Sequence, residues 1–214
     1  MTAPAARKPF DKTLRHADLE AMIDDLYSAK LLKLAANLPH SGRLATPDAT
    51  SEKISKLCGS RVVVDVVVDG DRVVDFAQDV KACALGQASA SVLGAHIMGA
   101  TLSEIELARE QFRAMLKQGA DAPEGRFSDL SMLAPVKDYP ARHASTLLAF
   151  EAVLRALDSL KASRGAEAAA AQLKPVVGPG TIIIAFQNGV EGADVVKRVV
   201  PAAHVITGVA RIAS

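Results

Sequence analysis

The feature that most constrains the fold is a pair of valine-rich segments separated by a tight turn. Residues 61–68 and 72–80 are rich in β-branched side chains, and an Asp-Gly-Asp turn sequence joins them at 69–71. Such a turn between two such runs predicts a β-hairpin, and therefore an antiparallel sheet. Asp65 and Asp75 alternate with the valines, and we expect both to lie on the solvent face of this hairpin.

Helical segments surround the predicted hairpin. Apolar residues at helical spacing, or small side chains suited to close packing, predict helices over 17–38, 84–98, 101–117 and 141–161, with a short helical piece at 129–136. The sequence Thr-Leu-Ser-Glu at 101–104 is a capping box. The polar stretch from His40 to about Lys56 is predicted to be a loop, and the position of a third strand is left open. The expected fold class is α+β, a small antiparallel sheet packed against helices.

Composition divides the chain into four segments. Residues 1–16 are small and basic and predict a disordered lead, and residues 17–162 hold the α+β body. Residues 163–172 are alanine-rich and are interpreted as a linker or a helical extension. In residues 173–214, an apolar run at 181–186 suits a buried parallel strand. This part is expected to be a partial α/β, Rossmann-like tail, with a short helix at 193–200 and a strand at 204–212.

Charge and composition exclude several classes of function. The formal net charge is +1 and there is no tryptophan, which argues against a nucleic-acid binder with a basic, base-stacking face. No apolar run approaches the roughly 18 residues that a membrane span needs. Two cysteines cannot form a disulfide framework, so the reducing cytoplasm is the expected location.

The two cysteines are the first candidates for chemistry. Cys58 precedes the first predicted strand and Cys83 follows the second, so a hairpin would return both to the same end of the sheet. Cys83 would lie at a helix N-terminus, which favours the thiolate that binds metal and attacks sulfur. Spacing alone slightly favours the alternative of two buried structural cysteines. His143 could complete a soft metal site with the two thiolates, although a surface histidine at a helix start is the simpler interpretation.

Three motifs in residues 24–160 carry a family resemblance. Asn-Leu-Pro-His-Ser-Gly at 37–42 resembles an Asn-Pro loop after a first helix, and Leu-Cys-Gly-Ser at 57–60 resembles a Cys-Gly-Asp motif. Residues 83–91 resemble a second cysteine motif that continues into Ser-Ala-Ser, and this is the most specific signal. The segment therefore resembles the NifU/IscU-type iron–sulfur cluster assembly scaffolds.

The chain departs from this family's pattern at two positions. The family's aspartate after Cys-Gly is Ser60 here, and that aspartate is thought to make a bound cluster labile. The family's third cysteine opens the last helix, and the matching position falls on Ala144 or Ser145. The nearest side chain able to bind metal there is His143, and an external thiol or a second subunit would be the other sources of a ligand.

The resemblance implies a scaffold that is not an enzyme. It would bind a transient iron–sulfur cluster, or zinc, through Cys58 and Cys83, with His143 as a weaker third ligand. The expected partners are a cysteine desulfurase that supplies sulfur and apo iron–sulfur proteins that receive the cluster, and a homodimer is among the expected assemblies. The alternative is a degenerate scaffold that acts only as an interaction partner.

The tail carries a second resemblance. Gly-Pro-Gly-Thr-Ile-Ile-Ile at 178–184 and Gln-Asn-Gly-Val at 187–190 resemble part of the nucleotide-binding domain of ketopantoate reductases. In that family the asparagine, which corresponds to Asn188, contacts cofactor and substrate. The Gly-x-Gly-x-x-Gly phosphate loop that such domains need is absent from this sequence. The tail is therefore interpreted as a fusion remnant without NADP-dependent activity.

Overall fold

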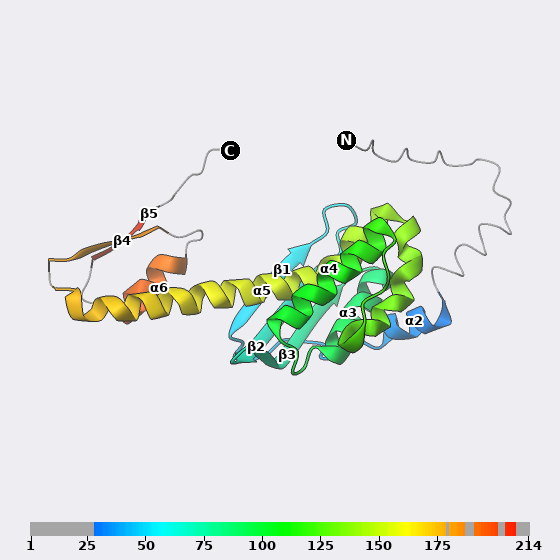
Figure 1. The fold of residues 1–214 in the computed structure, drawn as a ribbon, viewed down its shortest axis with the longest axis horizontal. Helices are drawn as coiled ribbons and strands as arrows, with labels where there is room; N and C mark the ends of the chain where they lie inside the picture. Colours follow the sequence, from blue (N-terminus) through cyan, green and yellow to red (C-terminus); the bar gives the residue numbers. More distant parts are fainter. Residues whose placement is uncertain (1–27, 179, 187–190, 201–203, 209–214) are drawn as a thin grey trace.

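The structure is a computed structural model that describes residues 28–178, 180–186, 191–200 and 204–208. Figure 1 shows a body of helices packed on a small sheet, from which one long helix leads to a separate C-terminal unit. The elements, in chain order, are α2 (Ala29–Ala36), β1 (Ala49–Ile54), β2 (Arg61–Asp69), β3 (Arg72–Lys81), α3 (Ala84–His96), α4 (Leu102–Gln118), the 3-10 segment η1 (Gly125–Asp138), α5 (Pro140–Leu173), η2 (Lys174–Val176), β4 (Ile182–Phe186), α6 (Glu191–Val199) and β5 (His204–Gly208).

The predicted hairpin is confirmed. β2 and β3 pair antiparallel from Arg61 opposite Lys81 to Asp69 opposite Arg72. The interpretation of residues 40–56 as a loop is wrong, because β1 lies within it and pairs antiparallel with β2. The sequence of β1, Ala-Thr-Ser-Glu-Lys-Ile, has one buried residue, Ser51, so this edge strand lacks the apolar alternation that would reveal it.

Helices cover one face of the sheet, as the α+β prediction requires (Figure 1). The valines at alternate positions of β2, Val62, Val64 and Val66, lie in the main core with the buried faces of α3, α4 and α5. The predicted capping box is present at the start of α4, where the Thr101 hydroxyl accepts a hydrogen bond from the Glu104 amide at 3.1 Å. Burial of one face of each element against this core holds the sheet and helices together.

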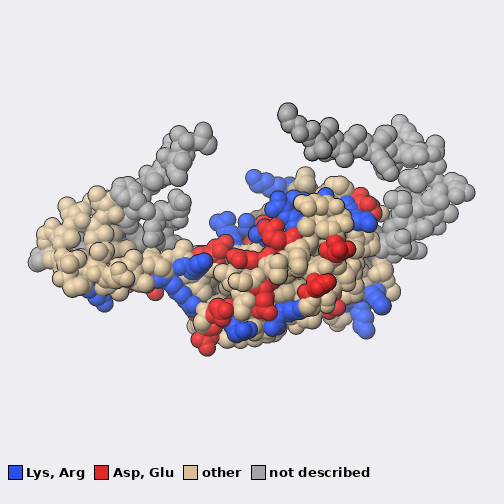
Figure 2. All heavy atoms as spheres, in the orientation of Figure 1, with Lys and Arg blue, Asp and Glu red and all other residues tan. Residues whose placement is uncertain are grey.

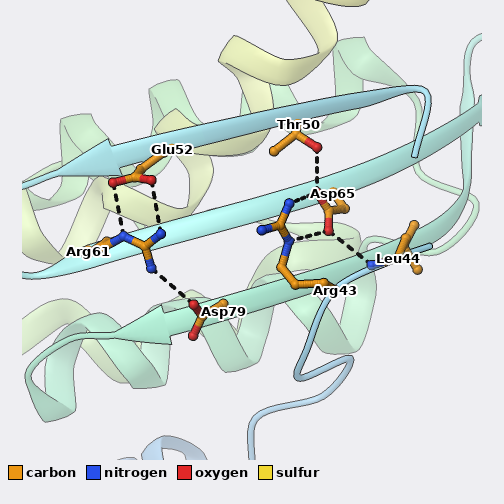
Figure 3. A network of polar contacts seen from close by, with 7 residues as sticks. All are labelled: Arg43, Leu44, Thr50, Glu52, Arg61, Asp65 and Asp79. Atoms are coloured by element: carbon orange, nitrogen blue, oxygen red, sulfur yellow. Dashed lines mark hydrogen bonds and ion pairs between the residues drawn. The ribbon is translucent and has the colours of Figure 1, made fainter. Parts of the chain in front are cut away.

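The expectation that Asp65 faces solvent is wrong. Its carboxylate does point away from the helices, but the segment after α2 crosses that face of the sheet and leaves the side chain of Asp65 fully buried. Arg43 donates two hydrogen bonds to it at 2.6 and 2.9 Å, and Thr50 and the amide of Leu44 donate two more (Figure 3). Asp75, in contrast, is exposed as predicted.

A second polar group on the same face ties the three strands together near their other end. Arg61 of β2 donates two hydrogen bonds to the carboxylate of Glu52 on β1 and one to Asp79 on β3, all at 3.0 Å (Figure 3). These side chains are partly exposed, so water screens the interaction. The network marks the end of the sheet at which β2 begins and β3 ends.

The last predicted helix extends further than residue 161. α5 continues through the alanine-rich segment 163–172, so of the two interpretations of this segment the helical extension is confirmed and the linker is wrong. Near the end of the body, the Arg164 side chain donates a hydrogen bond to the carbonyl of Val68 at 3.0 Å and contacts Asp48 at 3.4 Å. These contacts fix the middle of α5 against the turn end of the hairpin.

The C-terminal unit has two parallel strands, β4 and β5, connected through α6. Ala170 of α5 packs with Val196 and Val200 in a small apolar cluster of its own. The predicted strand at 204–212 extends to residue 208, and residues 209–214 lie outside the described residues. The predicted lead at 1–16 and the start of the helix predicted at 17–38 also lie outside the described part of the chain.

The surface of the body carries both signs of charge. Figure 2 shows acidic and basic side chains interspersed over the face in view, with basic side chains gathered toward the side that carries the β1–β2 loop. Among the described residues, none of the helices is long and apolar enough to cross a membrane.

Candidate functional site

Cys58 lies in the short loop that connects β1 to β2. Two backbone hydrogen bonds close this loop, from Gly59 to the carbonyl of Ser55 and from Ser55 to the carbonyl of Ser60, both at 2.8 Å. Gly59 has a φ of 71°, in the left-handed region that glycine adopts without steric cost. The loop presents Cys58 at the surface, beside the exposed side chain of Leu57.

Serine hydroxyls surround the Cys58 thiol. Its Sγ lies 3.3 Å from Oγ of Ser55 and 3.1 Å from Oγ of Ser60, and both serines are buried. Hydrogen bonds with the Ser55 and Ser60 hydroxyls, and with the Ser60 backbone, lower the pKa of Cys58 to about 7, against an opposing effect of burial. Cys58 therefore supplies more of the nucleophilic thiolate at neutral pH than an ordinary cysteine does.

Cys83 lies at the N-terminus of α3, as predicted. It occupies the N-cap position, with φ and ψ of −65° and 165°, and its side chain is partly buried. The thiol is 3.7 Å from the hydroxyl of Ser145, on the second turn of α5.

Ser145 brings the two cysteines together. After Ser55 and Ser60, its hydroxyl also contributes to lowering the pKa of Cys58, and it contacts Cys83 directly. The β1–β2 loop, the start of α3 and the start of α5 thus meet at one end of the sheet. The hairpin explains this arrangement, as predicted. Arg61 at the start of β2 pairs with Lys81 at the end of β3, so the residues just before β2 and just after β3 lie at the same end of the sheet.

Close packing of α3 against α5 depends on Gly86, one turn after Cys83. A Cβ at this position would lie 3.1 Å from the carbonyl oxygen of Ser145 and 2.9 Å from the Cβ of Ala82. Glycine therefore allows α5 to approach the start of α3 closely enough for Ser145 to reach the thiol.

His143 does not form a metal-binding group with the two thiols in this structure. Its ring is buried, and Nε2 lies 3.0 Å from the carbonyl oxygen of Val136 and 3.2 Å from that of Lys137. Because carbonyls only accept hydrogen bonds, Nε2 carries the proton and is not free to bind a metal. Among the described residues, no group of three or more His, Cys, Asp or Glu side chains is arranged to hold a metal ion.

One residue of this site, Ser55, was not identified from the sequence. It precedes Cys58 by three residues within a polar stretch, and its contact depends on how the loop closes. Recognition of β1 as a strand paired with β2 could have identified Ser55, because this pairing places Ser55 and Ser60 side by side at the two ends of the loop. Ser60 and Ser145 were singled out as departures from a pattern, and both contact cysteine thiols here.

Removing the Ser60 hydroxyl should raise the pKa of Cys58. In a Cys83→Ser background, we expect Ser60→Ala to move the pH midpoint of iodoacetamide alkylation upward from about 7, toward the ordinary thiol value of 9.0. At neutral pH the alkylation rate should therefore fall. Thr50→Ser, in the same background but remote from the thiol, is the matched control. An unchanged midpoint in Ser60→Ala would show that this hydroxyl does not stabilise the thiolate.

Comparison with known proteins gives the family. The family model for the NifU-like N-terminal domain matches residues 26–146, which is more than half of the chain. The chain belongs to this family. A NifU-like protein (N-terminal) from Brucella abortus has a solved structure that is similar at 49% identity and a TM-score of 0.65, over 66% of this chain and 98% of that one.

Two further relatives are similar to this chain over nearly the same share of its length. The iron-sulfur cluster assembly scaffold protein IscU of Thermotoga maritima is 27% identical over 135 residues, which cover 63% of this chain and 94% of that protein. A putative scaffold protein for the SUF system from Fervidobacterium islandicum is 25% identical with a TM-score of 0.58, over 63% of this chain and 98% of that structure. The NifU-like part of the chain, with its sheet and both cysteine motifs, accounts for these similarities.

The C-terminal part is similar to a different family. The family model for ketopantoate reductase PanE/ApbA matches residues 127–214 and overlaps the NifU-like match at 127–146. The overlap contains the start of α5, so the helix that carries Ser145 also leads into the reductase-like part. The resemblance of the tail to ketopantoate reductases is thus confirmed, over a longer stretch than 173–214.

Proposed function

We propose that this NifU-like protein is a scaffold for iron–sulfur cluster assembly. The observation that carries the proposal is the meeting of Cys58 and Cys83 around Ser145, at an exposed end of the sheet. A scaffold needs thiolates that are accessible enough to receive sulfur and iron and to release them again. Its partners would be a cysteine desulfurase and apo iron–sulfur proteins, and its role would be to carry cargo without catalytic turnover.

Cys58 is the residue best placed to receive sulfur. It is exposed, its loop extends from the body, and its low pKa supplies thiolate at neutral pH. The thiolate would attack the outer sulfur of a donor's cysteine persulfide, and the donor's own cysteine would leave as a thiolate. Cys58 would then hold the persulfide within reach of iron bound at Cys83.

The donor set suits a loosely held cargo. Two thiolates bind iron or zinc, but either metal would have further positions open to exchangeable ligands. Nε2 of His143 is held by the carbonyls of Val136 and Lys137, so His143 would join them through Nδ1 or after Nε2 left these carbonyls. We therefore propose Cys58 and Cys83 as the principal ligands, with His143 as a conditional third.

The test is anaerobic reconstitution of the full chain with iron, cysteine and a cysteine desulfurase. We expect visible thiolate-to-iron absorption on this protein, followed by its transfer to an added apo-ferredoxin. Binding of the desulfurase without any absorption would support the alternative of a scaffold that only interacts. NADPH binding, with no iron retained, would instead favour a function of the reductase-like part.

A third thiol in the correct place should strengthen cargo binding. We expect Ala144→Cys to retain iron about tenfold or more tightly than the wild type, since a gain of about 1.4 kcal/mol is enough for that factor. The residue is exposed and follows His143 directly, next to Ser145. Ala141→Cys, also exposed and one turn earlier on α5, is the matched control. Equal iron retention in the two variants would show that residue 144 does not face the cysteine pair.

A further inference from the structure

A groove lies next to the cysteine pair. It has a volume of about 760 Å³, which falls in the range of small-molecule sites. Leu147 and Leu148 contribute apolar side chains from α5, and the rim carries Lys53, Lys56 and Lys117 from β1, the β1–β2 loop and α4. Three elements that are separate in sequence thus line one groove.

The groove has an excess of positive charge. A fourth lysine, Lys137, lines it, and Glu151 is the one acidic residue among its lining residues. Within the described part of the chain, none of the four lysine ammonium groups has an ion-pair or hydrogen-bond partner. An apolar floor under unpaired lysines fits a small ligand with an uncharged middle and anionic ends.

The groove reaches the site of the two cysteines at two points. Ser55 lines it, and the hydroxyl of Ser55 is 3.3 Å from the Cys58 thiol. Ala144 also lines it and directly precedes Ser145, which contacts Cys83. A ligand in the groove would therefore approach the cysteine pair where the chain presents the methyl group of Ala144 and no thiol.

We propose that this groove binds a small carboxylate-bearing thiol, whose sulfur supplies the third thiolate for cargo held by Cys58 and Cys83. The supply of a third thiolate to the cargo rests on the proposed scaffold function. The lysines would bind the carboxylates, and Leu147 and Leu148 would contact the uncharged part. On metal binding the thiol loses its proton to solvent and forms a bond from sulfur to iron, without any change in oxidation state.

Binding to the metal-free protein tests the groove independently of cargo. With reduced glutathione as the probe, calorimetry should detect binding to the wild type. The double variant Lys56→Glu/Lys117→Glu should weaken it about tenfold or more, since each reversal replaces attraction by repulsion. Lys33→Glu, on the exposed face of α2 outside the groove, should bind like the wild type. The neutral double variant Lys56→Gln/Lys117→Gln should lose less glutathione affinity than the glutamate variant and keep the melting temperature of the wild type. This result would exclude misfolding as the cause of the loss.

Iron retention tests the role of the sulfur. Glutathione should increase iron retention by the wild type, whereas S-methylglutathione, which has no thiol, and 2-mercaptoethanol, which has no carboxylate, should not. Ala144→Cys should retain iron without glutathione. Absent glutathione binding, or binding unchanged in the glutamate variant, overturns the inference even if Cys58 and Cys83 hold iron. Normal glutathione binding with no iron retained would instead reject the scaffold function and leave the groove as a thiol-binding site.

Discussion

Replacing either cysteine by alanine is expected to abolish cargo binding. After anaerobic reconstitution and desalting, Cys58→Ala and Cys83→Ala should each retain iron at least about 100-fold more weakly than the wild type. The reason is that loss of a residue that merely supports a metal ligand already costs about 10–100-fold, and here the ligand itself is removed. The measurement is iron and acid-labile sulfide per chain, together with visible absorption.

Leu57→Ala provides the matched control for these variants. Leu57 is exposed in the same loop and precedes Cys58 directly, so its truncation disturbs the loop but keeps both thiols. It should retain iron like the wild type. If both cysteine variants also retain iron like the wild type and melt at the same temperature, the two thiols are not the binding site.

Removing the buried carboxylate of the sheet should have the largest effect on stability. We expect Asp65→Ala to lower the free energy of unfolding by about 3 kcal/mol, because it leaves the Thr50 hydroxyl, the Leu44 amide and the Arg43 guanidinium without their acceptor. Arg43 is half exposed and its guanidinium can turn to water. The expected loss of stability therefore lies at the lower end of the range for breaking a buried ion pair. Urea unfolding at neutral pH measures it.

The same variant should change how stability depends on pH. Burial raises the pKa of Asp65, but hydrogen bonds from Arg43, Thr50 and Leu44 outweigh it and hold the pKa below its ordinary value. The carboxylate therefore contributes stability above the pKa of the unfolded chain, and this contribution is lost as pH falls through the lower folded pKa. The difference in stability between wild type and Asp65→Ala should shrink in acid.

Glu52→Ala is the control for this second prediction. Glu52 also forms an ion pair on the sheet face, with Arg61, but both partners are partly exposed and water can replace the interaction. Its replacement should change stability far less than that of Asp65. Equal effects of the two substitutions would contradict the role of Asp65 as the buried acceptor that Arg43, Leu44 and Thr50 share.

Local signals in the sequence were sufficient for the hairpin, the capped helix α4 and the meeting of the two cysteines. Each depends on short-range rules: a turn between β-branched runs, a capping box, and the return of a hairpin to one end of its sheet. Cys83 at the N-cap of α3 follows from the same reasoning, because a helix of small residues begins directly after it.

Features that depend on long-range packing could not be predicted in this way. Asp65 alternates with valines like a surface residue, and it is buried only because Arg43, 22 residues earlier, crosses over it. β1 is polar and becomes a strand through its pairing with β2. His143 has the chemistry of a ligand, but the bend between η1 and α5 places the carbonyls of Val136 and Lys137 against its ring.

Phenylarsine oxide tests the central claim most directly, because its arsenic bonds two thiols of one chain at once and releases water. Mass spectrometry of the metal-free protein should show a single arsenic adduct per chain, with both Cys58 and Cys83 then protected from iodoacetamide. Neither Cys58→Ala nor Cys83→Ala should form a stable adduct. Full alkylation of both cysteines after treatment would show that the thiols do not share one site.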